Sequence, residues 1–167
     1  MAIFTWHNGN VPEGMKVTQV YGLVFTKDGR MLLKVEKVGD KIMYSLAGGK
    51  PELEDNSREE TLKREFLEEV NTTLQDGALV VGYQQVDEED GSPPYAQMRM
   101  SAIIDSIGIR QPDPDTGKTY DRLLTTPKRA IELLNWGEVG ESQVNEALRI
   151  AKEHLGLKEY STKEEYV

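Results

Sequence analysis

The stretch NSREETLKREFLEEVN, residues 56–71, carries the strongest structural signal in the chain. Ser57, followed three residues later by Glu60, has the pattern of a capping box and predicts that a helix begins there. Asn71 suits the left-handed backbone conformation in which many helices end. The stretch therefore predicts a helix over residues 57–70.

The predicted helix has two faces of different chemistry. At about 100° per residue, its bulky apolar side chains share one face, which we expect to meet a core: Leu62, Phe66 and Val70. Glu65, Glu68 and Glu69 gather on another face, where each like-charged pair costs a few tenths of a kcal/mol. A hard cation such as Mg²⁺, which prefers oxygen ligands, would compensate this repulsion. A merely solvated acidic face is the alternative interpretation.

The order of residues along this helix is more specific than its acidity. Arg64-Glu65-Phe66-Leu67-Glu68-Glu69 matches the REUxEE core of the Nudix box, where U is a bulky apolar residue. The segment LAGGKPE, residues 46–52, resembles the strand end and Gly-Gly turn that open the box. The chain thus resembles the Nudix family over Gly48 to Thr72, and more loosely over most of residues 17–155.

The match to the pattern Gx5Ex7REUxEExGU departs at three points. One residue is inserted between Gly49 and Arg64. The isolated glutamate of the pattern is replaced by Asp55 or served by the neighbouring Glu54. Asn71 stands where the late glycine is expected, a mild change because Asn tolerates the left-handed conformation.

The resemblance implies a fold, a reaction and a metal. The fold is α/β, an α/β/α sandwich with a mixed β-sheet between helices. The reaction is Mg²⁺-dependent hydrolysis, with Mn²⁺ as a substitute, of a phosphoanhydride bond in a nucleoside diphosphate linked to another group. By the same resemblance, Glu65, Glu68 and Glu69 are catalytic metal ligands, with the backbone of Gly49 beside the metal, and Arg64 holds a glutamate in place. A catalytically weak nucleotide-binding or sensing domain of the same fold is the alternative.

Three further residues are candidate substrate contacts. Lys34 could reach a phosphate, although a solvated strand lysine is the simpler interpretation. Gly48 allows close approach of a ligand to the backbone, and Tyr83 could stack on a base. An additional carboxylate for the metal or for proton transfer could come from a later loop: Asp113, Asp115, Asp121, Glu88 or Glu89.

The other elements follow from residue type and spacing. Runs rich in β-branched and aromatic residues predict strands over 17–26, 31–38, 41–46, 78–86 and 95–109. The turn Asp28-Gly29 predicts that the first two form a hairpin, and residues 110–122 are expected to be a loop. Helices are expected over 127–136 and 141–155, the second with this core face: Val144, Leu148, Ala151 and Leu155. We expect one domain over 1–167, with its core in 16–156 and a loose tail over 157–167.

Composition limits the partners. The 167 residues carry 20 Lys and Arg against 29 Asp and Glu, a net charge of −9, which disfavours a nucleic-acid backbone as partner. The absence of cysteine excludes disulfides and thiolate metal sites and suits a reducing cytoplasm. No apolar run approaches the length of a membrane span. A small nucleotide-type diphosphate is the expected partner, and a homodimer is left open.

Overall fold

All residues, 1–167, are described in a computed structural model, which contains ten strands and three helices. Their bounds are β1 Ile3–Asn8, β2 Val17–Phe25, β3 Met31–Val38, β4 Lys41–Ser45, β5 Gly48–Gly49, α1 Arg58–Val70, β6 Thr72–Leu74, β7 Leu79–Asp87, β8 Tyr95–Ile107, β9 Asp121–Thr125, α2 Pro127–Leu134, α3 Gly137–His154 and β10 Glu165–Tyr166. The five expected strands end within about two residues of their predicted bounds.

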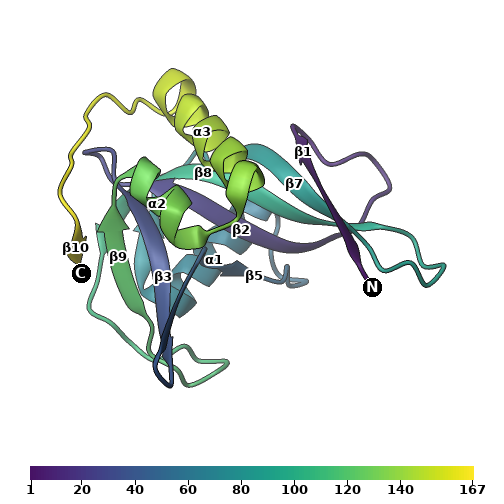
Figure 1. The fold of residues 1–167 in the computed structure, drawn as a ribbon, viewed down its shortest axis with the longest axis horizontal. Helices are drawn as coiled ribbons and strands as arrows, with labels where there is room; N and C mark the ends of the chain where they lie inside the picture. Colours follow the sequence, from purple (N-terminus) through teal and green to yellow (C-terminus); the bar gives the residue numbers. More distant parts are fainter.

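The strands form one mixed sheet (Figure 1). Their order is β1-β7-β8-β2-β3-β9-β10, with β4 beside β3, β5 beside β2 and β6 beside β8. β2 and β8 pair in parallel, and the remaining pairs are antiparallel. None of the three helices is long and apolar enough to cross a lipid bilayer.

Strand β2 contributes to a separate core on each face of the sheet. Successive side chains of a strand point to opposite faces, so Leu23 and Phe25 pack with α2 and α3, whereas Val20 and Val24 pack with α1. Figure 1 shows α2 and α3 in front of the sheet and α1 behind it. The expected α/β/α sandwich with a mixed sheet is confirmed.

Helix α1 forms as its sequence predicts. The Ser57 side chain accepts a hydrogen bond from the Glu60 amide, and Asn71 ends the helix with φ of 43°. Its expected core-facing residues are all buried: Leu62, Phe66 and Val70. The guanidinium of Arg122, from β9, donates to the carbonyl of Val70 at 2.8 Å and so satisfies one of the free carbonyls at the helix end.

The hairpin predicted at Asp28-Gly29 is only partly right. The turn is present, but β2 and β3 pair at a single position, Phe25 with Met31. Beyond that pair the strands separate, β5 pairs with β2, and β3 pairs with β4 and β9. This separation gives the Gly48-Gly49 turn its place beside β2, facing α1.

Two predictions about the C-terminal third are wrong. Helix α3 begins at Gly137 rather than Glu141, and its buried residues are Gly140, Gln143, Val144, Ala147, Ile150 and Ala151. Leu148 and Leu155 are only partly buried. Both sets fit the three-to-four spacing of a helix face, so the spacing alone does not choose between them.

The expected loose tail is instead attached to the sheet, the second of these errors. Leu157 is buried in the core, and Glu165 and Tyr166 pair with Leu124 and Leu123 of β9. Glu165 also forms an ion pair with Arg30 at 2.9 Å. Such pairings join distant parts of the chain, and the polar sequence of the tail does not reveal them. The short or edge strands β1, β6, β9 and β10 were missed for the same reason.

Candidate active site

The acidic face of α1 lies against the Gly48-Gly49 turn of β5. A Cβ atom at Gly49 would lie 2.5 Å from the carboxyl carbon of Glu65. At Gly48, where φ is +153°, a Cβ atom would lie 2.1 Å from the carbonyl oxygen of Val20. Both glycines are therefore required by close packing: Gly49 makes room for Glu65, and Gly48 lets the turn pair with β2.

Arg64 is held by Asp55 through two hydrogen bonds. Its Nε and Nη2 donate to the two carboxylate oxygens of Asp55 at 3.1 and 2.9 Å. Asp55 also accepts from the Glu52 amide and the Thr61 hydroxyl, both at 2.9 Å. The Arg64 guanidinium holds the pKa of the Asp55 carboxyl well below its usual range. Of the two sequence alternatives, Asp55 rather than Glu54 therefore takes the place of the isolated glutamate.

Glu65 and Glu68 share one nitrogen of Arg64. Nη1 of Arg64 lies 2.9 Å from Oε1 of Glu65 and 3.4 Å from Oε2 of Glu68. Arg64 thus contacts two of the three glutamates on this face of α1. Desolvation raises the pKa of both carboxyls, although the charge of Arg64 acts in the opposite direction.

Glu69 is directed toward the sheet. Its Oε2 lies 2.6 Å from Nζ of Lys34, and its Oε1 accepts a hydrogen bond of 2.7 Å from the Gly48 amide. Nζ of Lys34 also lies 4.6 Å from the ring centroid of Tyr120, a cation–π contact. The solvated-lysine interpretation of Lys34 is wrong, because its ammonium group belongs to this carboxylate cluster.

The cluster fits a divalent cation by its chemistry. Glu65, Glu68 and Glu69 offer only carboxylate oxygens, the donor type that Mg²⁺ and Mn²⁺ prefer. As placed, no three acidic or histidine side chains are gathered closely enough to hold a metal ion. Glu65 and Glu68 converge on Arg64, and Glu69 is paired with Lys34 instead.

Only one of the later carboxylates is coupled to this cluster. The charge of Asp115 raises the pKa of Glu68, after the larger effect of desolvation. The other candidates are occupied elsewhere: Asp113 accepts from the Asp115 amide, Asp121 pairs with Arg110, Glu88 accepts from Tyr95, and Glu89 lies in the β7–β8 turn.

Tyr83 does not join the cluster. It is buried on β7, and its ring stacks on His7 with centroids 4.9 Å apart. β8 separates β7 from β2 in the sheet. Tyr120 was not among the candidates from the sequence, because its contact with Lys34 depends on the pairing of β3 with β9.

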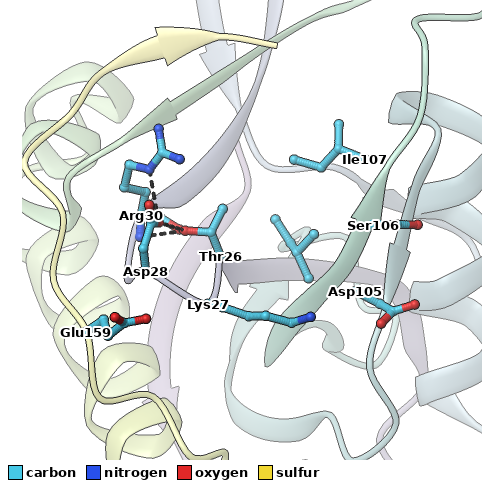
Figure 2. A pocket seen from close by; sticks show the side chains of 9 residues that line it. Thr26, Lys27, Asp28, Arg30, Asp105, Ser106, Ile107 and Glu159 are labelled. Carbon is cyan, nitrogen blue, oxygen red and sulfur yellow. Dashed lines mark hydrogen bonds and ion pairs between the residues drawn. The ribbon is translucent and has the colours of Figure 1, made fainter.

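A separate pocket of about 410 Å³ opens between the β2–β3 turn and the end of β8 (Figure 2). Arg30 on its wall is already paired with Asp28 and Glu165, and Thr26 donates to Asp28. None of the α1 glutamates lines this pocket. The carboxylate cluster beside Gly49 is therefore the stronger candidate for chemistry.

Solved structures resemble this chain, whereas no protein-family model and no curated protein matches it. The solution structure of the E. coli ORF135 protein has a TM-score of 0.57 and 20% identity, over 87% of this chain and 99% of that one. A NUDIX hydrolase from Nitrosomonas europaea gives 0.51 and 18%, over 87% and 93%. The Bacillus subtilis pyrophosphohydrolase BsRppH, as its E68A mutant, gives 0.51 and 19%, over 64% and 63%. The chain has the Nudix hydrolase fold.

Proposed function

We propose that this protein is a Nudix-type pyrophosphohydrolase that cleaves a phosphoanhydride bond in a nucleoside diphosphate derivative. The observation that carries the proposal is the cluster of Glu65, Glu68 and Arg64 against Gly49, with Asp55 behind the arginine. Similar folds include a pyrophosphohydrolase and a NUDIX hydrolase. The sequence match to the box and the fold therefore support the same chemistry.

We propose Glu65, Glu68 and Glu69 as the ligands of Mg²⁺, with Mn²⁺ as a substitute and the backbone of Gly49 close by. The bound ion would neutralise the pyrophosphate and stabilise the charge that develops during hydrolysis. Arg64 orients Glu65 and Glu68, and Asp55 fixes Arg64. Because its guanidinium is held by four acidic groups, Arg64 acts as a positioning residue.

The chain's own residues supply two further functions. Lys34 holds its ammonium group within the cluster, where it can attract a phosphate oxygen. Burial raises the pKa of the Glu65 and Glu68 carboxyls, which moves them toward the range of a general base. One of these carboxylates would accept the proton of the attacking water.

Metal-dependent release of phosphate tests this proposal. The purified protein is incubated with nucleoside triphosphates, ADP-ribose, sugar nucleotides and dinucleoside polyphosphates, with Mg²⁺ or Mn²⁺ and a coupled phosphatase. We expect activity that a chelator abolishes and that Glu68→Gln lowers by orders of magnitude. Glu36→Gln is the matched control and should retain activity. Glu36 lies on β3, and its carboxylate pairs with Lys118.

The second candidate is a binding or sensing domain that turns over substrate slowly. The observation that favours it is the pairing of Glu69 with Lys34, which leaves no three acidic side chains gathered for a metal. Nucleotide binding measured by calorimetry, without any product after long incubation, would support this candidate. Equal activity of wild type and Glu68→Gln would show that the carboxylate cluster does not carry the activity.

A further inference from the structure

Arg99, on β8, is a buried cation without a carboxylate partner. It is 7% exposed, and it forms no ion pair although the chain has 29 acidic residues. Its Nε donates to Oε1 of Gln143 and its Nη1 to the carbonyl of Gln97, both at 3.2 Å. Desolvation lowers its pKa to about 10, so the guanidinium remains charged at neutral pH. Burying an uncompensated charge opposes folding, and binding of a ligand would account for it.

Two donor groups beside each other have no acceptor within the chain. Gln143 is 1% exposed, and its amide oxygen faces Arg99 because arginine has no acceptor atom. Its Nε2 and the Nη2 of Arg99 form no hydrogen bond. No fully buried side-chain nitrogen or oxygen in the chain lacks a partner, so both groups keep a path to solvent. A ligand that reaches these two groups would therefore meet donors.

Aromatic rings border these donors. The Arg99 guanidinium lies 4.8 Å from the ring centroid of Tyr21 and 5.9 Å from that of Trp136. Trp136 is 36% exposed at the turn before α3, so one of the two rings that border Arg99 reaches the surface. A charged fork between an aromatic ring of β2 and an exposed tryptophan suits a flat, polar, aromatic ligand.

One row of the sheet connects this group to the carboxylate cluster. Arg99 of β8 is paired with Tyr21 of β2, and Tyr21 is paired with Gly48 of β5. The amide of Gly48 donates to Glu69. Neighbouring strands lie about 4.8 Å apart, so Arg99 and Gly48, whose amide contacts the cluster, lie two strands apart along this row.

We propose that Arg99 and Gln143 bind the base of the substrate nucleotide and select a 6-oxopurine, the class that includes guanine, through O6 and N7. This inference rests on the proposed function for the position of the phosphates. Guanine presents O6 and N7 as adjacent acceptors, which match two donors. Adenine presents N7 beside the amino group at C6, and this amino group is a donor that would face one of the two donors of the protein. Uracil has no such pair, because its N3–H donor lies between O4 and O2. Cytosine does present N3 beside O2, so a comparison of GMP with CMP separates these two bases, and CMP binding as tight as that of GMP would overturn the purine assignment.

Calorimetric titration of the whole protein with GMP, IMP and AMP, without added metal, tests the inference. These monophosphates contain no phosphoanhydride bond, so binding is measured without turnover. GMP and IMP share O6 and N7, and we expect both to bind about tenfold or more tightly than AMP. Equal affinity for AMP, or no binding of any of the three at millimolar concentration, overturns the inference.

Two variants and two controls locate the selectivity. Gln143→Glu removes the free donor, and Arg99→Lys removes the planar fork, so each should lower GMP affinity about tenfold and bring it near that of AMP. Arg149→Lys and Asn145→Asp make the same chemical changes at exposed positions of α3 and should preserve selectivity. Wild-type preference alone still decides the question if a variant does not fold.

Two outcomes separate this inference from the proposed function. Selective binding of GMP and IMP without hydrolysis of any diphosphate derivative would contradict the proposed hydrolase activity and support the base assignment. Hydrolysis of guanine and adenine derivatives with equal kcat/KM would support the proposed hydrolase activity and contradict the base assignment. If Arg99→Lys weakens binding of ribose 5-phosphate as much as that of GMP, Arg99 contacts a phosphate and the base assignment is wrong.

Discussion

Asp55 accepts hydrogen bonds from both Nε and Nη2 of Arg64, at 3.1 and 2.9 Å. This pairing joins the loop before α1 to the acidic face of the helix. The same guanidinium contacts Glu65 and Glu68. A change at Asp55 should therefore reach the carboxylate cluster through Arg64, without touching any of the three glutamates.

Asp55→Asn should destabilise the protein by about 2 kcal/mol, because it weakens a charge-assisted pair whose carboxylate side chain is 7% exposed. Urea denaturation measures the loss. Asp40→Asn, at an exposed turn, is the control and should change the free energy of unfolding little. A difference of less than about 0.5 kcal/mol between the two variants would show that the pairing is not a stabilising contact.

The contribution of Asp55 should depend on pH in a defined direction. The pKa of this carboxyl is lowered in the folded protein, so the stabilisation is present above the unfolded value of about 4. It is lost as the pH falls through the lower, folded value. The difference in unfolding free energy between wild type and Asp55→Asn should therefore shrink from pH 6 to pH 2. A difference that grows toward acid would contradict the assignment.

Gly49→Ala should impair activity more than stability. The added Cβ would lie 2.5 Å from the carboxyl carbon of Glu65 and would displace it. We expect kcat/KM to fall about tenfold or more, in line with the cost of misplacing a catalytic group. Gly77→Ala is the control. A Cβ atom at Gly77 would contact no other atom, but the φ of +103° is strained for alanine. That variant should lower the melting temperature and leave kcat/KM unchanged.

The Lys34–Glu69 pair should be coupled in stability. Lys34→Met alone leaves a buried carboxylate without its cation and should cost about 3 kcal/mol, whereas Lys34→Met with Glu69→Gln should cost less than the sum of the two changes. A double-mutant cycle by urea denaturation in the presence of a chelator measures this coupling. Strict additivity would show that the 2.6 Å contact carries no net interaction.

The sequence predicted the local features of the site correctly. Helix α1 begins after Ser57 and ends at Asn71 because its own residues make both caps. Its apolar and acidic faces follow from helical spacing alone. Adjacent glycines marked the turn that Glu65 approaches. Each of these features depends on contacts between residues close in the chain, which the order of residues specifies directly.

Other relationships depended on pairing between distant strands. Lys34 reaches Glu69 across 35 residues, and its contact with Tyr120 follows from β3 lying beside β9. No local pattern distinguishes such a lysine from a solvated one. Tyr83 had the residue type expected of a base contact, yet β7 places it against His7.

By itself, the sequence determined helix α1, its caps, the Gly-Gly turn and the α/β class, because each arises from neighbouring residues. Only the tertiary structure decided that Asp55 holds Arg64, that residues 157–167 return to β9, and that Arg99 meets Gln143 across 44 residues. Strand order and register select these partners, and they result from the packing of the whole chain. The same packing pairs both Arg99 and Gly48 with Tyr21 of β2.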